Sequence, residues 1–180
     1  MDFKPCLRLL PGTQELWMTP SLEASAFRLP NPGLAVEIRD EGVLLQDAID
    51  RVRQGGGNPN DQRLVQSRIQ LQFGKYRGKT FHWVLSNDMG WTCAVLASHK
   101  MEREAGDDRQ HPAMRHKDAL LAYAVQFGEV KTAVWASKLM RGSLIKEDVR
   151  YFDDHRVGTG QQARATFRAL YESANDEQKS

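Results

Sequence analysis

Alternation of polar and apolar positions is strongest at residues 68–73, where every second side chain would face the same side of a strand. A turn bounded by glycines follows at residues 74–78, and residues 79–81 either return as a second strand or lead into a helix. A shorter alternation marks residues 34–38 as another strand. The pattern therefore predicts a short β-hairpin near the middle of the chain and a short strand before it.

Apolar residues elsewhere recur at the spacing of a helix face, every three or four positions. Thr80 and Asp88 are suited to cap the starts of two such segments, and Pro112 is suited to the first turn of a third. The fold class predicted is α+β: a short β-hairpin followed by a helical bundle, after a Pro-rich N-terminal region with short strands. The spacing predicts helices at residues 43–54, 81–86, 89–105, 112–127, 130–142 and 161–174.

Four regions follow from the distribution of proline, glycine and charge. Residues 1–54 hold five of the seven prolines, which predicts a Pro-rich N-terminal region of loops, a short strand and a helix. Residues 55–61 form a Gly-rich linker or exposed loop, because their glycines cost ordering entropy and offer no side chain to pack. Residues 62–127 form a basic β-turn-helix module, and residues 128–180 form a helical C-terminal region.

Composition narrows the class of protein further. No run approaches the ~18 apolar residues that cross a bilayer, so we expect no membrane association. The first residues lack the apolar core of a signal peptide, which favours an intracellular location, nuclear or cytoplasmic. Cys6 and Cys93 lie far apart and do not make a disulfide framework. We expect Cys93 to be buried and Cys6 to be partly exposed.

The most informative stretch is residues 62–80, which contains five cations and no acidic residue. A tight glycine-bounded turn would place cations and backbone amides where phosphate oxygens approach, and Tyr76, with only polar or glycine neighbours, would offer a face for base stacking. Ordinary surface cations on a solvated turn are the alternative interpretation. The spacing is not that of a P-loop. The predicted nucleic-acid-binding residues are Arg68, Lys75, Tyr76, Arg77 and Lys79.

Residues 73–91, FGKYRGKTFHWVLSNDMGW, resemble the small FGKYKGK module. That module occurs in the quorum-sensing-regulated virulence factor family and at the C-terminus of exodeoxyribonuclease X-like exonucleases. A closer variant, FGKYKGKTF-x-W-x-x-x-N-D-x-G-[YW], occurs in uncharacterised animal proteins, some of them transposon-derived. The resemblance covers about residues 69–127, with Arg77 where lysine is usual. It implies an accessory module in a nucleic-acid setting, and no exonuclease carboxylates accompany it here. The matching positions are Phe73, Gly74, Lys75, Tyr76, Gly78, Lys79, Trp83, Asn87, Asp88, Gly90 and Trp91.

Candidates for metal or acid–base chemistry are few. Cys93 and three histidines fall close together in sequence, but only His111 and His116 have the spacing of a zinc-ligand pair. We therefore predict no metal site and no cofactor. The acidic segment from Glu102 to Asp108 is interleaved with cations, which is typical of a solvated helix end.

Three functions remain open. The basic turn and the resemblance favour a non-catalytic nucleic-acid-binding accessory module whose cations contact phosphates. The first alternative is a protein–protein interaction or scaffold domain, which an exposed apolar patch on residues 128–152 would favour. The second is a metal-dependent phosphodiester-acting enzyme that holds its metal with the segment from Glu102 to Asp108.

Overall fold

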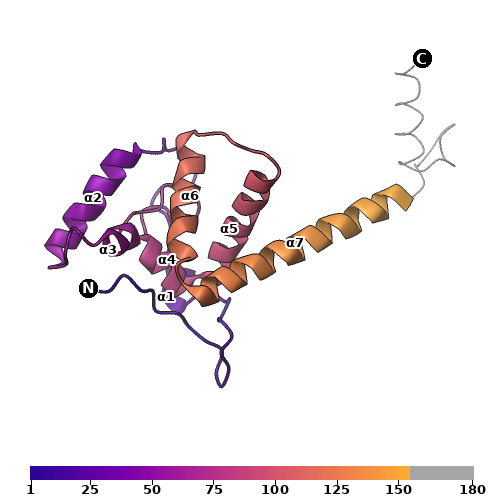
Figure 1. The fold of residues 1–180 in the computed structure, drawn as a ribbon, viewed down its shortest axis with the longest axis horizontal. Helices are drawn as coiled ribbons and strands as arrows, with labels where there is room; N and C mark the ends of the chain where they lie inside the picture. The colour runs from indigo at the N-terminus through magenta and orange to yellow at the C-terminus, as the bar shows by residue number, and fades with distance from the viewer. Residues whose placement is uncertain (155–180) are drawn as a thin grey trace, which may run out of the picture. The chain divides into compact units, whose positions relative to one another are not determined.

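The computed structural model describes the backbone of residues 1–154 and the side chains of residues 1–143. Within this part of the chain the regular structure is helical (Figure 1). The predicted helix at residues 161–174 lies outside the described residues. The helices are α1 (Leu22–Ala26), α2 (Glu41–Gln54), α3 (Gln62–Ser67), α4 (Phe81–Asn87), α5 (Met89–Glu104), α6 (Pro112–Ala124) and α7 (Gly128–Asp154).

The predicted α+β fold with a β-hairpin is wrong, because residues 1–154 contain no sheet. Two isolated antiparallel bridges join Leu9 to Leu16 and Gln70 to Thr80. Around the second bridge, Leu71 N–H donates to the Lys79 carbonyl at 2.8 Å. Pairing stops there because Thr80 already caps α4, so the returning segment is too short to form a strand. Residues 34–38 form no strand either, and most of their side chains are exposed.

Helix starts were predicted well where a capping residue marks them. The Thr80 side chain accepts a hydrogen bond from Trp83 N–H at 3.2 Å, and Asp88 Oδ1 accepts one from Trp91 N–H at 3.0 Å. Pro112 is the first residue of α6, as predicted. The predicted end at Gly142 is wrong, because α7 continues to Asp154. One glycine inside a helix costs only about 1 kcal/mol relative to alanine, which does not by itself end it.

The core gathers where α4 and α6 meet the other helices. Helix α6 contacts α3, α4 and α5, and α2 packs on α3. The largest buried side chains come from these helices and from the loop before α4. They are Leu71, Tyr76, Phe81, Leu85, Leu96, Leu120 and Tyr123. Cys93, on α5, is buried among them, whereas Cys6 is exposed.

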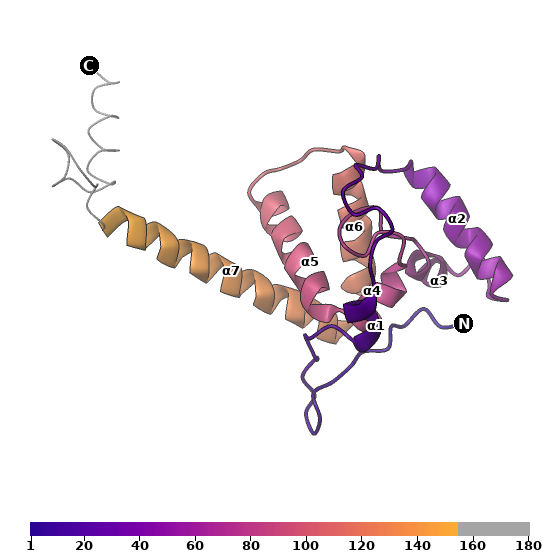
Figure 2. The same cartoon turned by 180° about the vertical axis from the view of Figure 1, so that it is seen from behind.

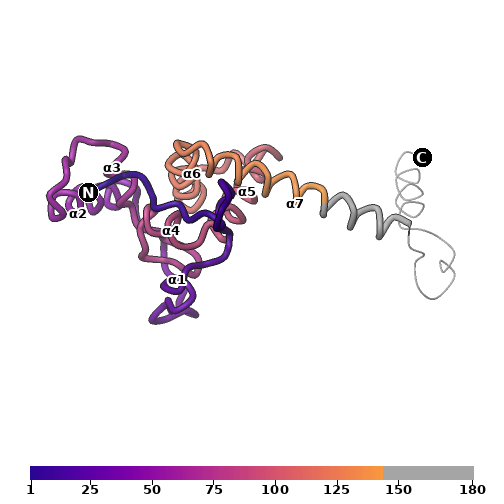
Figure 3. The backbone as a smooth tube through the Cα atoms, turned by 90° about the horizontal axis from the view of Figure 1, so that it is seen from below, coloured from indigo at the N-terminus to yellow at the C-terminus, as the bar shows by residue number. Residues whose placement is uncertain are grey.

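The N-terminal region packs on α4 and α6 through backbone contacts. Tyr123 Oη donates to the Phe3 carbonyl at 2.6 Å, and Cys6 N–H donates to Ser86 Oγ at 3.0 Å. Ser21 N–H donates to the Asn87 carbonyl at 2.7 Å, which holds the start of α1 against the end of α4. Figure 2 shows α1 beside α4, and Figure 3 shows the first residues running along α4.

The contacts divide the chain into two compact units, Met1–Lys138 and Leu139–Ser180. The first unit contains α1 to α6 and the first part of α7. All of the candidate site described below belongs to it. In the described part of the chain, no helix has the length and apolar character needed to cross a membrane.

Candidate nucleic-acid interface

Residues 74–79, which we call the basic loop, have a fixed backbone. Gly74 and Gly78 adopt φ values of +71° and +89°, a region that side-chain-bearing residues rarely occupy. A Cβ atom at Gly74 would also lie 2.7 Å from the Trp91 side chain. Hydrogen bonds from Gly78 N–H to the Leu71 carbonyl and from Lys79 N–H to the Tyr76 carbonyl close the loop at 2.8 and 3.0 Å. The three cations of the loop therefore project from a rigid turn.

Tyr76 is part of the core. Only 2% of the residue is exposed, and its ring meets the edges of Trp83 and Trp91 at centroid distances of 5.4 and 5.2 Å. Its hydroxyl donates to Asp88 Oδ2 at 2.5 Å. Burial, followed by this hydrogen bond, raises the pKa of Tyr76 above its ordinary value. The expected exposed face for base stacking is therefore wrong, because the ring is enclosed by other side chains.

Asp88 connects the basic loop to α5. One carboxylate oxygen caps the helix, and the other accepts the Tyr76 hydroxyl and lies 3.1 Å from Lys75 Nζ. Asp88 is buried, while about half of the Lys75 side chain is exposed. The carboxylate therefore offsets part of the Lys75 charge, although the ammonium can still meet a ligand from solvent.

Lys79 and Arg77 have no carboxylate within ion-pair distance among the described residues. Lys79 Nζ lies 4.7 Å from the centre of the Phe27 ring and 4.6 Å from that of Trp83, in cation–π contact with both. Arg77 Nη1 makes one long hydrogen bond, 3.4 Å, to the Leu34 carbonyl. These contacts leave most of the hydrogen-bonding capacity of both cations unused.

Arg68 does not join the loop. Its guanidinium donates to Ser67 Oγ at 3.0 Å and to the Asp2 carbonyl at 2.9 Å, so it ties α3 to the first residues of the chain. The structure thus brings Lys75, Arg77 and Lys79 together on one loop. It places Arg68 against another segment.

Two residues near the loop were missed by sequence reasoning. Phe27 lies just after α1 and packs against Trp83 at 6.1 Å between ring centroids. Glu23, on α1, accepts a hydrogen bond from Trp83 Nε1 at 2.7 Å. Both lie more than fifty positions before Trp83 in the chain, and no local pattern links such distant residues. Glu23 matters because it is an acidic group beside the ring that Lys79 covers.

Other motif positions support the fold. Asn87 Nδ2 donates to the Trp83 carbonyl at 2.9 Å, and its Oδ1 accepts from Ser21 Oγ at 2.8 Å. Gly90 N–H donates to the Met18 carbonyl at 3.1 Å, and a Cβ atom at Gly90 would clash with that carbonyl. The N-D-x-G part of the motif therefore holds residues 18–21 against the junction of α4 and α5.

Three of the four acidic residues between Glu102 and Asp108 form ion pairs with other described residues. Glu104 pairs with Lys138 and with Lys100, and Asp107 pairs with Arg109 at 2.5 Å. Hydrogen bonds from Lys138 and Lys100 lower the pKa of Glu104. In the part of the chain that the structure describes, no three potential metal ligands lie close enough to share an ion. Nothing in this segment supports the metal-dependent enzyme.

Comparisons with known proteins find no matching family model, curated protein or solved structure. The similarity of residues 69–127 to the FGKYKGK module therefore stays a prediction, based on the motif residues alone.

Proposed function

We propose that this chain is a non-catalytic nucleic-acid-binding module whose basic loop contacts phosphates through Lys75, Arg77 and Lys79. The observation that carries the proposal is the rigid turn, which presents three cations of which two have no carboxylate partner among the described residues. A fixed turn loses little backbone entropy when it binds. The resemblance to a module found in exonucleases and in transposon-derived proteins agrees with this role.

The expected binding is weak and depends on salt. Each cation that neutralises a phosphate releases counterions, so three contacts predict a slope of about −3 for log K against log salt on duplex DNA. Asp88 offsets part of the Lys75 charge, so the slope expected for the loop lies between about −3 and about −2. Phosphate contacts carry no sequence information, so different sequences should bind equally well.

Fluorescence anisotropy with labelled DNA and RNA, single- and double-stranded, tests the proposal at low and moderate salt. The main variant replaces Lys75, Arg77 and Lys79 with glutamine. The matched control replaces Lys4, Arg53 and Lys131, three exposed cations from other segments, and so removes the same charge. Circular dichroism establishes that both variants are folded.

The loop variant should lose at least tenfold in affinity and most of its salt slope, while the control variant should change much less. Glu23→Gln should raise affinity, because it removes the acidic group beside Trp83 and Lys79. Arg68→Gln should have little effect if only the loop makes the contact. Absence of binding at low salt, or equal losses in the two triple variants, would rule out the loop as the contact surface.

One observation favours protein interaction as a second candidate. Leu139 and Met140, neighbours on α7, are 70% and 68% exposed, more than most of the other large apolar residues with exposed side chains. They fall within residues 128–152, where an exposed apolar patch was expected to favour this alternative, and side chains from residue 144 onward lie outside the described part. A protein partner becomes the better explanation if the nucleic-acid experiment fails.

A further inference from the structure

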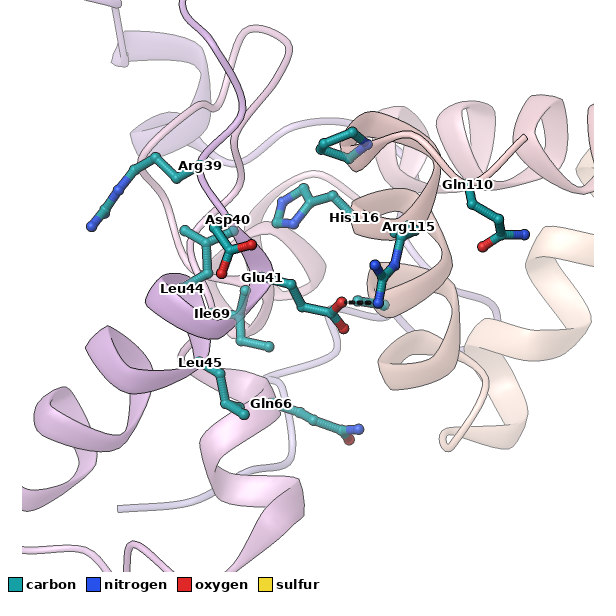
Figure 4. Close-up of a pocket in the computed structure, with 12 residues that line it drawn as sticks. Arg39, Asp40, Glu41, Leu44, Leu45, Gln66, Ile69, Gln110, Arg115 and His116 are labelled. Atoms are coloured by element: carbon teal, nitrogen blue, oxygen red, sulfur yellow. Dashed lines mark ion pairs between the residues drawn. The ribbon is translucent and has the colours of Figure 1, made fainter. Parts of the chain in front are cut away.

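A cavity of about 220 Å³ lies between the start of α2, the end of α3 and the start of α6 (Figure 4). Leu44 and Leu45 line it from α2, Ile69 from the segment after α3, and Ala119 and His116 from α6. None of its lining residues belongs to the basic loop. Any role of this cavity is therefore separate from the proposed contact with phosphates.

The lining combines apolar side chains with polar and charged ones, among them Gln66 and Gln110. Leu44 and Ile69 are buried, and Ala119 is half-buried. An engineered apolar cavity of about 150 Å³ takes up benzene, so 220 Å³ is enough for one aromatic ring with a small substituent. Pockets for drug-sized ligands start at about 300 Å³, so a whole nucleotide is too large.

Among the polar residues that line the cavity, His116 is the buried one. The residue is 6% exposed, and its Nε2 accepts a hydrogen bond from Gln72 N–H at 3.2 Å. In the neutral ring the proton then lies on Nδ1, which has no hydrogen-bond partner among the described residues. Burial lowers the pKa of His116 to about 4, so the ring stays neutral near pH 7. Figure 4 shows the ring between α6 and the start of α2.

Charges at the mouth of the cavity are already paired. Arg115 on α6 and Glu41 on α2 form an ion pair at 2.5 Å, drawn as a dashed line in Figure 4. Arg39 is paired with Asp47 at 2.6 Å, and Asp40 caps α2 by accepting from Gly42 N–H. The buried apolar side chains Leu44 and Ile69 offer a charge no partner, which favours a neutral ligand.

We propose that this cavity binds a small neutral aromatic carbonyl compound. Its ring would lie against Leu44, Ile69 and Ala119, and its carbonyl oxygen would accept a hydrogen bond from His116 Nδ1–H. The apolar wall formed by Leu44, Ile69 and Ala119 suits the ring, the buried donor of His116 suits the carbonyl, and the volume limits the ligand to about the size of acetophenone.

Titration of the full chain with acetophenone, followed by ¹H–¹⁵N NMR, tests this proposal. Saturable shifts should appear at the amides of Ile69, Gln72 and His116. Ethylbenzene has the same ring and nearly the same size but no acceptor. Its binding therefore reports burial of the ring alone. The ring nitrogens of His116 should shift with acetophenone and not with ethylbenzene.

Filling the cavity gives the second test. Ala119→Leu should weaken acetophenone binding at least tenfold, whereas Ala122→Leu, at an exposed position on the same helix, should leave it unchanged. The ring-nitrogen measurement needs no substitution, so it decides the question even if Ala119→Leu fails to fold. The proposal is overturned by the absence of saturable shifts, by equal shifts of the His116 ring nitrogens with the two compounds, or by unchanged binding in Ala119→Leu.

Discussion

The Asp88 side chain joins three parts of the motif described above. Its two oxygens accept from a backbone amide at the start of α5 and from the buried Tyr76 hydroxyl, and they pair with Lys75. These contacts differ in energy. A helix cap is worth about 1 kcal/mol, and a buried hydroxyl without a partner costs about 1–3 kcal/mol. A half-exposed ion pair contributes less than about 1 kcal/mol.

Asp88→Ala should therefore lower the free energy of unfolding by about 2–4 kcal/mol, because it removes the cap and leaves the Tyr76 hydroxyl unpaired. Lys75→Met, the matched control, removes the ion pair and the cation–π contact with the Tyr76 ring but keeps the cap and the Tyr76 hydrogen bond, and should cost about 1 kcal/mol. Urea denaturation measures both values. Equal losses in the two variants would mean that the surface ion pair, and not the buried contacts, gives Asp88 its importance.

His116 should make stability depend on pH. Burial lowers its pKa to about 4 in the folded chain, from an ordinary value of 6.5. Between these values the unfolded chain binds a proton that the folded chain does not, so stability falls as the pH drops through this window. Above pH 6.5 none of this stability is lost. The full loss, reached below pH 4, corresponds to about 3 kcal/mol at most.

Urea denaturation of wild type and His116→Gln at pH 7.5 and at pH 4.5 measures this contribution. The pKa of His82 is also lowered, by burial and then by Arg68, so the wild type has more than one source of pH dependence. The difference between the two proteins isolates His116, and the variant should lose less stability at low pH. Identical pH dependence in both would contradict the assignment.

At the scale of the elements, the junction of α4 and α5 holds the N-terminal region in place. Gly90, in the first turn of α5, lets the Met18 carbonyl approach the helix and donates a hydrogen bond to it. Gly128 starts α7 and has open space where a Cβ atom would be. Both glycines lie in the first turn of a helix. They differ in whether another group occupies the space that a Cβ atom would fill.

Gly90→Ala should destabilise the chain by about 1–3 kcal/mol, because the added methyl group forces residue 18 away from α5. Gly128→Ala should be neutral or slightly stabilising. Thermal unfolding of both variants measures the difference. A Gly90→Ala protein as stable as the Gly128→Ala protein would show that residues 18–21 are not held at this junction.

Helix starts could be predicted from sequence because a cap is local. Thr80 and Asp88 each bond to an amide three residues further along. The hairpin could not be judged in the same way, since a strand depends on how long its partner remains extended. Residues 68–73 alternate correctly, but the returning segment enters α4 at Phe81. Short helices such as α3 have too few turns to show a periodic apolar face.

The candidate site was predicted in part for a similar reason. The cations at positions 75, 77 and 79 share one loop because they are neighbours in sequence. Tyr76 has polar and glycine neighbours, yet it is buried because Trp83, Trp91 and Asp88 close around it from two helices. Local polarity does not reveal such long-range packing.

At the scale of the whole molecule, charge is spread over many ion pairs and the net value is only +2. Acidic and basic side chains pair across α2 and α6, within α5, and between α5 and α7. An overall field is therefore too small to steer a polyanion to the chain. Local cations that have no carboxylate partner among the described residues, such as Arg77 and Lys79, matter more for the proposed function than the total charge does.

The reactivity of the two cysteines can be used to measure the rate at which the core opens. Cys6 is exposed, whereas Cys93 is buried and burial raises the pKa of its thiol to about 11. Exposed thiolates react with disulfide reagents and buried thiols do not. A disulfide reagent that releases a coloured product should therefore label Cys6 at once, and Cys93 only when α5 leaves the core. Two phases of equal amplitude should appear, and urea should accelerate only the slow phase. Cys6→Ser should remove the fast phase. The rate of the remaining phase then measures how often α5 leaves the core, and no probe has to be attached beforehand.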